Sequence, residues 1–118
     1  FYGHAARDTV EDMHGGVFRG GPGLDRVGHL HAGRFAGARG PDRVGMQYGG
    51  FFLGERGQDT VFFKFGGTFK GGSQADGVER TMTGGTFNGG SGRDAVVGYE
   101  AGRLISVEKC KRPITACP

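Results

Sequence analysis

Two apolar residue types recur along this chain at one fixed spacing. A Phe is followed nine residues later by a Val, and the pair returns every 17 residues, with a single interval of 18. Because glycines are dense between them, helices are disfavoured, and 17 residues are too few for a helical hairpin repeat. The period instead suits one coil of a β-solenoid with two short strands and two tight turns. The two columns are Phe1, Phe18, Phe35, Phe52, Phe69 and Phe87, and Val10, Val27, Val44, Val61, Val78 and Val96.

The pattern predicts an all-β chain, a parallel β-solenoid (β-roll) of about six 17-residue coils. One strand of each coil centres on the Phe and the other on the Val, and we expect both columns to face inward as two apolar ladders. Side chains alternate between the faces of a strand, so Phe51 and Phe62 are predicted to point outward. An exposed aromatic surface on a stiff rod is typical of an interface, either with a partner or with a second copy.

Composition agrees with an ordered repeat. The 118 residues include 27 Gly and 10 Phe, and disordered chains are usually poor in aromatic residues. A Gly stands two residues after each repeat Phe, and a pair of small residues closes each unit. The extra residue of the fifth unit falls between Val78 and Gly84.

An acidic residue recurs with the same period, two residues before each Val. Successive coils lie about 4.8 Å apart, so carboxylates in one column would repel each other unless something neutralises them. A Gly stands two residues before most of these carboxylates. The column is Asp8, Asp25, Asp42, Asp59, Asp76 and Asp94, and the glycines are Gly23, Gly40, Gly57 and Gly92.

The turns that carry these Asp residues resemble the hemolysin-type calcium-binding nonapeptide G-G-x-G-x-D-x-U-x of RTX proteins. The resemblance covers the chain up to about residue 97 and implies a parallel β-roll with Ca²⁺ held between successive turns. It implies Asp25, Asp42, Asp59, Asp76 and Asp94 as ligands, with Gly23, Gly40, Gly57 and Gly92 in the same turns. The turns read GGPGLDRV (20–27), GARGPDRV (37–44), GERGQDTV (54–61), GGSQADGV (71–78) and GGSGRDAV (89–96).

A metal-free interpretation of the Asp column stays open beside calcium. Only one half of each coil carries the motif, the chain is basic, and Gln74 replaces the Gly before Asp76. Each Asp would then accept hydrogen bonds from backbone N–H groups of its own turn. Arginines next to the column would supply the opposite charge. These are Arg7, Arg26, Arg43 and Arg93.

Charge and motifs exclude several function classes. The net charge is +3 with scattered Lys and Arg, so no segment resembles a nucleic-acid-binding arm. No apolar run is long enough to span a membrane, and no nucleophile motif accompanies the periodic Asp residues. We therefore expect a non-enzymatic protein. Cys110 and Cys117 predict a disulfide and an extracellular setting, with two free thiols as the alternative.

One further column mixes imidazoles with other large side chains, four residues after the Val. We expect these residues to form a half-buried flank of the solenoid, and a transition-metal site on the two histidines is the alternative. The column comprises His14, His31, Tyr48, Phe65 and Met82.

The predicted organisation is a six-coil solenoid over 1–102 and a cap over 103–118, with a final strand at 103–108 and a Cys110–Cys117 loop. Phe1 falls on the Phe column, so the first coil has no cap of its own, and pairing of that end with another molecule would build a filament. The expected function is a secreted structural or assembly module, for which stabilisation by Ca²⁺ and a metal-free Asp column are the two open interpretations. The alternatives are a calcium-responsive RTX-like domain of a larger exported protein and an extracellular carbohydrate- or surface-binding module.

Overall fold

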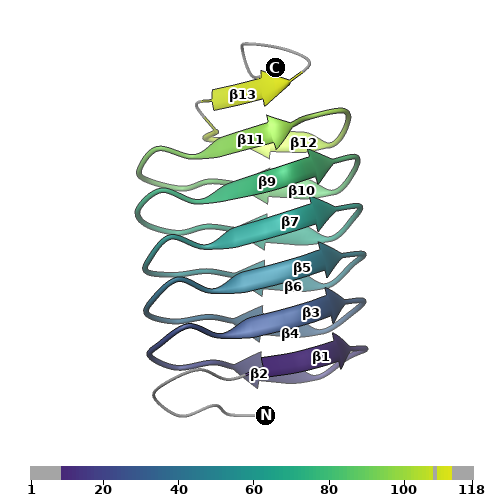
Figure 1. Ribbon diagram of the computed structural model, residues 1–118, viewed down its shortest axis with the longest axis vertical. Helices are drawn as coiled ribbons and strands as arrows, with labels where there is room; N and C mark the ends of the chain where they lie inside the picture. The colour runs from purple at the N-terminus through teal and green to yellow at the C-terminus, as the bar shows by residue number, and fades with distance from the viewer. Residues whose placement is uncertain (1–8, 108, 113–118) are drawn as a thin grey trace.

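A computed structural model describes residues 9–107 and 109–112, and the chain in these ranges winds into a parallel β-solenoid (Figure 1). Strands alternate between two sheets that face each other along the whole rod. The seven-stranded sheet has the order β1-β3-β5-β7-β9-β11-β13 and the six-stranded sheet the order β12-β10-β8-β6-β4-β2. All the described pairings are parallel, so the predicted fold of about six coils of about 17 residues is confirmed.

The strands are short because a turn follows every three to six residues. In the seven-stranded sheet they are β1 (Thr9–Met13), β3 (Arg26–Leu30), β5 (Arg43–Gln47), β7 (Thr60–Lys64), β9 (Gly77–Met82), β11 (Ala95–Gly98) and β13 (Lys109–Arg112). In the six-stranded sheet they are β2 (Val17–Arg19), β4 (Arg34–Ala36), β6 (Phe51–Leu53), β8 (Thr68–Lys70), β10 (Thr86–Asn88) and β12 (Arg103–Ile105).

Register is set by the repeat itself. Phe35 of β4 pairs with Phe52 of β6, and Val44 of β5 with Val61 of β7, so like residues stack on like residues. Consecutive Phe rings from Phe18 to Phe87 lie 4.7–4.9 Å apart and within 5–7° of parallel. That separation equals the spacing of neighbouring strands, which imposes face-to-face stacking on the rings. Phe18 to Phe87 and Val27 to Val96 of the two columns are buried, as the sequence predicts, and Val10 at the end of the described part is half-buried.

The fifth coil carries its extra residue inside β9. The pairing of β7 with β9 shifts between Val61↔Val78 and Phe63↔Thr81, which is a β-bulge, and Lys64 then pairs with Met82. Met82 is fully buried. Its predicted place on the outer flank with His14 and His31 is therefore wrong, because the bulge precedes Met82 and returns it to the interior.

Both sheets continue past the predicted boundary at residue 102. Leu104 of β12 pairs with Phe87, and Cys110 of β13 pairs with Val96, so each occupies an apolar column of the interior. The predicted final strand is thus present at Arg103–Ile105. Cys117 and Phe1 lie outside the described residues, so the Cys110–Cys117 disulfide and the pairing of the first coil stay predictions.

Candidate functional site

The Asp ladder (Asp25, Asp42, Asp59, Asp76 and Asp94) lies inside the solenoid. These carboxyl groups are buried, with exposed fractions of 0–4%. The backbone N–H groups of the first four, from Asp25 to Asp76, each donate to Oδ1 of the Asp in the next coil, at 2.8–3.0 Å. The ladder therefore links successive coils through the side chains, in the direction in which the sheets link them through the backbone. Sequence reasoning expected bonds within each Asp's own turn, whereas these bonds join neighbouring turns.

The second carboxyl oxygen explains the glycine column. A Cβ added to Gly54 would overlap Oδ2 of Asp59, and Gly37 stands in the same relation to Asp42. From Phe18 to Phe87, glycine therefore stands two residues after each repeat Phe because the Asp side chain fills the space. In Asp42, Asp59 and Asp76, Oδ2 has no hydrogen-bond partner among the described residues.

Burial and mutual repulsion favour the uncharged form of the ladder. Burial raises the pKa of Asp42 to about 8, of Asp59 to about 10 and of Asp76 to about 7, and a neighbouring ladder carboxylate adds to each rise. A hydrogen bond to a neighbouring backbone N–H lowers each pKa without reversing the shift. A protonated carboxyl keeps Oδ1 as an acceptor and removes the charge, so Asp42, Asp59 and Asp76 can stack in that form without a counterion.

This arrangement bears on the two interpretations of the ladder. Within the described ranges, no ion pair joins Asp42, Asp59 or Asp76 to an arginine, and Arg26 and Arg43 are exposed on the outer face. Three or more His, Cys, Asp or Glu side chains arranged to hold a metal ion are not found in residues 9–107 and 109–112. Oδ1 is occupied by a backbone donor and Oδ2 abuts glycine, which suits the metal-free form; calcium binding stays a prediction.

A second buried polar group lies across the interior, and the sequence analysis missed it. Lys64 and Gln47 are both fully buried. The Lys64 Nζ donates to Gln47 Oε1 at 2.9 Å and to the carbonyl oxygens of Gly66 and Gly67 at 2.9 and 2.8 Å. Gln47 Nε2 in turn donates to the Thr68 carbonyl at 2.9 Å. These two residues, here called the Lys–Gln pair, form a closed network.

The Lys–Gln pair occupies a column that is otherwise apolar. Three acceptors surround Nζ, which matches the three N–H groups of an ammonium, while burial lowers the pKa of Lys64 to about 7. The sequence does contain a signal for this third inward column. In the first four coils its residue stands three positions after the repeat Val. The column reads Met13, Leu30, Gln47, Lys64 and Met82.

An exposed stack of rings runs along one edge of the rod, here called the ring edge (His14, His31, Tyr48 and Phe65). Successive ring centroids lie 4.5, 4.9 and 5.2 Å apart. Tyr48 and Phe65 are 44% and 43% exposed. Because the rings cover each other's faces, a sugar meets ring edges along most of the stack. Stacking of a sugar on an aromatic face, the basis of the carbohydrate alternative, is therefore not favoured here.

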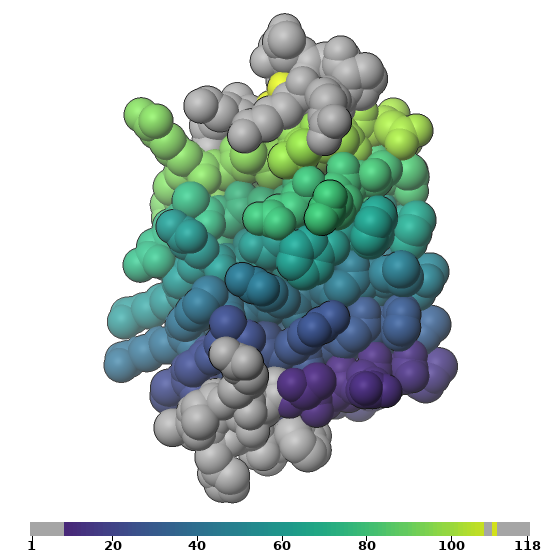
Figure 2. Space-filling view, in the orientation of Figure 1, coloured from purple at the N-terminus to yellow at the C-terminus, as the bar shows by residue number. Residues whose placement is uncertain are grey.

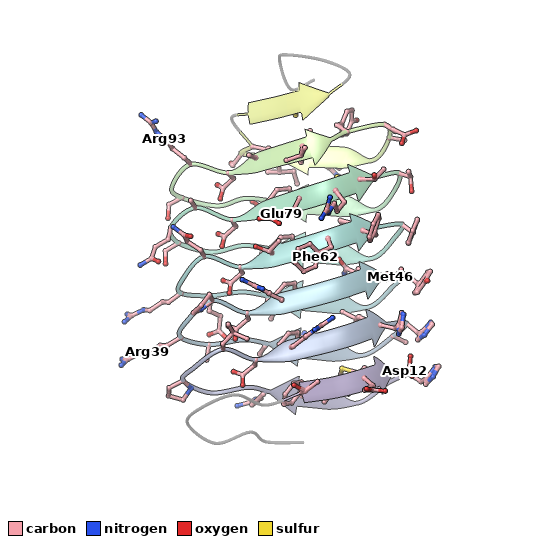
Figure 3. The ribbon with its side chains drawn as sticks, in the orientation of Figure 1. Asp12, Arg39, Met46, Phe62, Glu79 and Arg93 are labelled. Atoms are coloured by element: carbon pink, nitrogen blue, oxygen red, sulfur yellow. The ribbon has the colours of Figure 1, made fainter. Side chains whose placement is uncertain are left out.

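Beside the ring edge, Asp12 lies at the same margin of the seven-stranded sheet (Figure 3). Asp12 Oδ1 is 2.9 Å from His29 Nδ1 and 3.8 Å from His31 Nε2. All three side chains are more than a third exposed. Such solvated pairs contribute little to stability.

The two predicted interface residues are separate from each other. Phe51 is 49% exposed on β6, and Phe62 is half-buried on β7, so they belong to different sheets on opposite faces of the rod. The Phe62 face forms layers of stacked side chains (Figure 2). An arginine guanidinium lies 6.0 Å from each ring centroid, Arg34 at Phe51 and Arg43 at Phe62. The two rings therefore offer two surfaces.

No helix long and apolar enough to cross a membrane is found among the described residues. Comparison of the chain with protein-family models, with curated proteins and with solved structures finds no match in any of the three.

Proposed function

We propose that this chain is a non-enzymatic structural module, a stiff β-solenoid rod that holds a regular surface in place. The observation that carries the proposal is the register of three columns, Phe, Val and Asp, which repeat in the same place in each complete coil and persist across the β-bulge in β9. Because each coil stacks on a neighbour with the same inward residues, only one register is favourable. The side chains on the surface therefore stand at a fixed spacing.

Hydrogen exchange on the full chain tests the rigidity. The amides of β3 to β10 are expected to exchange together and slowly, because each coil is held by two sheets and by an Asp bond to the next coil. Independent fast exchange of any one central coil would contradict a rod that behaves as a unit. A matched variant with Phe52→Ala opens the Phe column and should make the amides of β6 and its neighbours exchange faster than in wild type.

Self-association is the assembly function that the exposed rings favour. Tyr48 and Phe65 of the ring edge are large aromatic groups that are 44% and 43% exposed, and such groups are usually covered in assemblies. Sedimentation over a concentration series should show oligomers for wild type and a smaller fraction for Tyr48→Ser/Phe65→Ser. Thr83→Ser on the same side of the rod serves as the control. A monomer at all concentrations would remove assembly from the proposal and leave the rod intact.

Stabilisation by Ca²⁺ and the alternative role as a calcium-responsive exported domain are tested together. Support comes only from the turn sequences around Asp25 and Asp94. Circular dichroism is measured with Ca²⁺ and with EDTA: loss of the β signal in EDTA favours the calcium-responsive domain. Unchanged melting favours the metal-free ladder. Export is tested by thiol titration, which should find Cys110 and Cys117 joined before reduction and reactive after it.

A further inference from the structure

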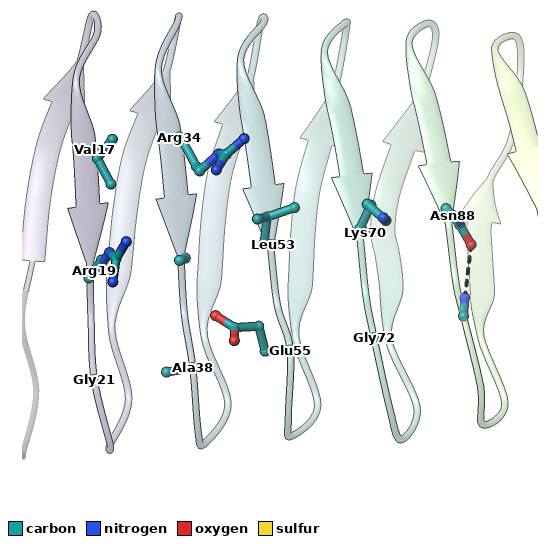
Figure 4. Close-up of a pocket in the computed structure, with 12 residues that line it drawn as sticks. Val17, Arg19, Gly21, Arg34, Ala38, Leu53, Glu55, Lys70, Gly72 and Asn88 are labelled. Atoms are coloured by element: carbon teal, nitrogen blue, oxygen red, sulfur yellow. Dashed lines mark hydrogen bonds between the residues drawn. The ribbon is translucent and has the colours of Figure 1, made fainter.

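A groove runs along the outer face of the six-stranded sheet and crosses five successive coils. Its volume is about 750 Å³, and its lining comes from β2, β4, β6, β8 and β10 with the turns that follow them. Figure 4 shows this face with the strands side by side and the lining side chains in rows. Small residues such as Ala36 and Ala38 line part of it, next to half-buried Leu53. The hollow therefore follows the long axis of the rod.

Charge on the groove is one-sided. Arg19, Arg34 and Lys70 line it, against the single carboxylate of Glu55. Among residues 9–107 and 109–112, no salt bridge joins Arg34 or Lys70 to a carboxylate. Two copies of this face would place like charges together, which disfavours a second copy as the occupant. The complementary occupant is anionic.

The spacing of the cations limits the charge density of that occupant. Arg34 lies on β4 and Lys70 on β8, two strands further, so they stand about 10 Å apart along the axis. Double-stranded DNA carries one charge per about 1.7 Å of its axis. A groove with one cation every one or two coils matches a polymer of lower charge density than double-stranded DNA.

The sheet also excludes the usual way of binding an extended peptide. Peptides add to the edge of a sheet through main-chain hydrogen bonds. The groove lies on a sheet face, where the backbone groups of β4, β6 and β8 already pair with each other. A ligand in the groove can therefore be recognised only by side chains. These side chains form an apolar floor and carry cationic groups that are separated from one another. A sugar chain with carboxylates presents both apolar C–H surfaces and separated anions.

Backbone geometry marks the same groove. Ala38 and Glu55 have φ of 67° and 68°, in the left-handed region, and both line it, whereas Gly21, Gly72 and Gly90 hold the equivalent positions in other coils. Non-glycine residues in this conformation carry strain and cluster at functional sites. We propose that the groove binds an extended anionic polysaccharide, a chain of uronic-acid type, through Arg34 and Lys70. The proposal rests on the rod of the proposed function and needs no assembly of it.

Binding of the full chain to polygalacturonate tests the proposal, with dextran, polyglutamate and single-stranded DNA as comparison polymers. The titration is followed by calorimetry, starting at about 0.15 M salt, where the Debye length is about 8 Å. Wild type should bind polygalacturonate most tightly, and binding should weaken as salt rises. Arg34→Glu/Lys70→Glu should weaken it about tenfold or more, because two attractions become repulsions. Ala36→Phe should also weaken it by filling the floor.

Arg26→Glu/Arg80→Glu is the matched control, since both arginines are exposed on β3 and β9 of the seven-stranded sheet, on the opposite face of the rod from the groove. It changes the net charge equally and should alter the affinity by less than about twofold, as exposed charges beyond a Debye length are screened. An equal loss in the control, equal binding of dextran or polyglutamate, tighter binding of DNA, or no binding of polygalacturonate would each overturn the proposal. Circular dichroism and sedimentation of the same variants show separately whether the rod and its assembly persist.

Discussion

The Asp ladder and the Lys–Gln pair are two buried polar regions on opposite sides of one narrow interior, and they solve the same problem differently. The ladder repeats in each coil and satisfies Oδ1 through the backbone of its neighbour. The Lys–Gln pair occurs once and satisfies itself through Gln47 and the carbonyls of one turn. Burial raises the pKa of Asp42 and Asp59 and lowers the pKa of Lys64, so burial favours the uncharged form in both regions.

The difference shows which polar groups a solenoid tolerates. A repeated polar residue must find its partner in the coil above or below, because those are its permanent neighbours. A single polar residue in an apolar column has no repeated partner and needs a second polar residue in an adjacent coil. Gln47, one coil from Lys64, is that residue. Five predictions sharpen this comparison, and the single substitutions among them run from the largest expected effect to the smallest.

Truncation of the Lys–Gln pair should cost the most. Lys64→Ala leaves Gln47 Oε1 and two turn carbonyls without their donor and opens a cavity, so the free energy of unfolding should fall by about 3–5 kcal/mol. Urea denaturation measures it. Lys70→Ala, an exposed lysine, is the control and should change the value by less than about 0.5 kcal/mol.

Replacing both members tests whether the Lys–Gln pair serves stability at all. Gln47→Leu/Lys64→Met restores the apolar character of the column next to Leu30 and Met82 and should be neutral or stabilising. A double variant as unstable as Lys64→Ala would show that the backbone carbonyls, rather than the buried amine, set the cost.

Shortening one member of the Asp ladder should cost less. Asp59→Ala leaves the buried N–H of Asp42 without its acceptor, which lowers the free energy of unfolding by about 1–3 kcal/mol. Asp59→Asn keeps an oxygen in the accepting position and should lie closer to wild type at pH 6. Thermal melts of the two variants measure this difference. If Asp59→Asn lowers the melting temperature as much as Asp59→Ala, the carboxyl proton is itself required.

The two regions should also respond to pH with opposite signs. The folded ladder holds protons that the unfolded chain loses above pH 3.8, so stability falls as pH rises from 3.8 towards about 7–10. Folded Lys64 is neutral between about pH 7 and 10.5 while the unfolded amine is charged, so its contribution to stability rises across that window.

Melting temperatures from pH 4 to 10 measure both effects. Wild type should melt several degrees higher at pH 5 than at pH 8, and Asp59→Asn should reduce that difference. Lys64→Met should remove the opposing rise above pH 7. A wild-type melting temperature that increases from pH 5 to pH 8 would contradict an uncharged ladder.

Relief of backbone strain beside the ladder should have the smallest effect. Gln74 stands two residues before Asp76 with φ of 71°, where the other described turns of the ladder place glycine. Gln74→Gly should therefore raise the free energy of unfolding by up to about 1 kcal/mol, as glycine adopts this conformation without strain. Gln58→Gly, at a position without positive φ, is the control and should give no gain.

The repeat made much of this structure predictable. The spacing of Phe and Val gave the coil length, the two inward columns and the outward direction of Phe51, because a period of 17 allows few other folds. The Asp column was recognised, but its direction was not: a carboxylate on a glycine-rich turn suggests an ion, whereas here the side chain turns inward against Gly54 and its equivalents. Met82 was misplaced since one inserted residue exchanges the two faces of a strand.

The sequence by itself determined the architecture, because periodic residues can only stack on their own copies. Only the tertiary structure decided the chemistry of the interior. Whether a carboxyl is charged depends on its exposure and on the next carboxyl, and a lysine in an apolar column is explained only by the three acceptors around Nζ. The groove likewise arises from small side chains on five coils, which lie far apart along the chain and meet only in the folded sheet.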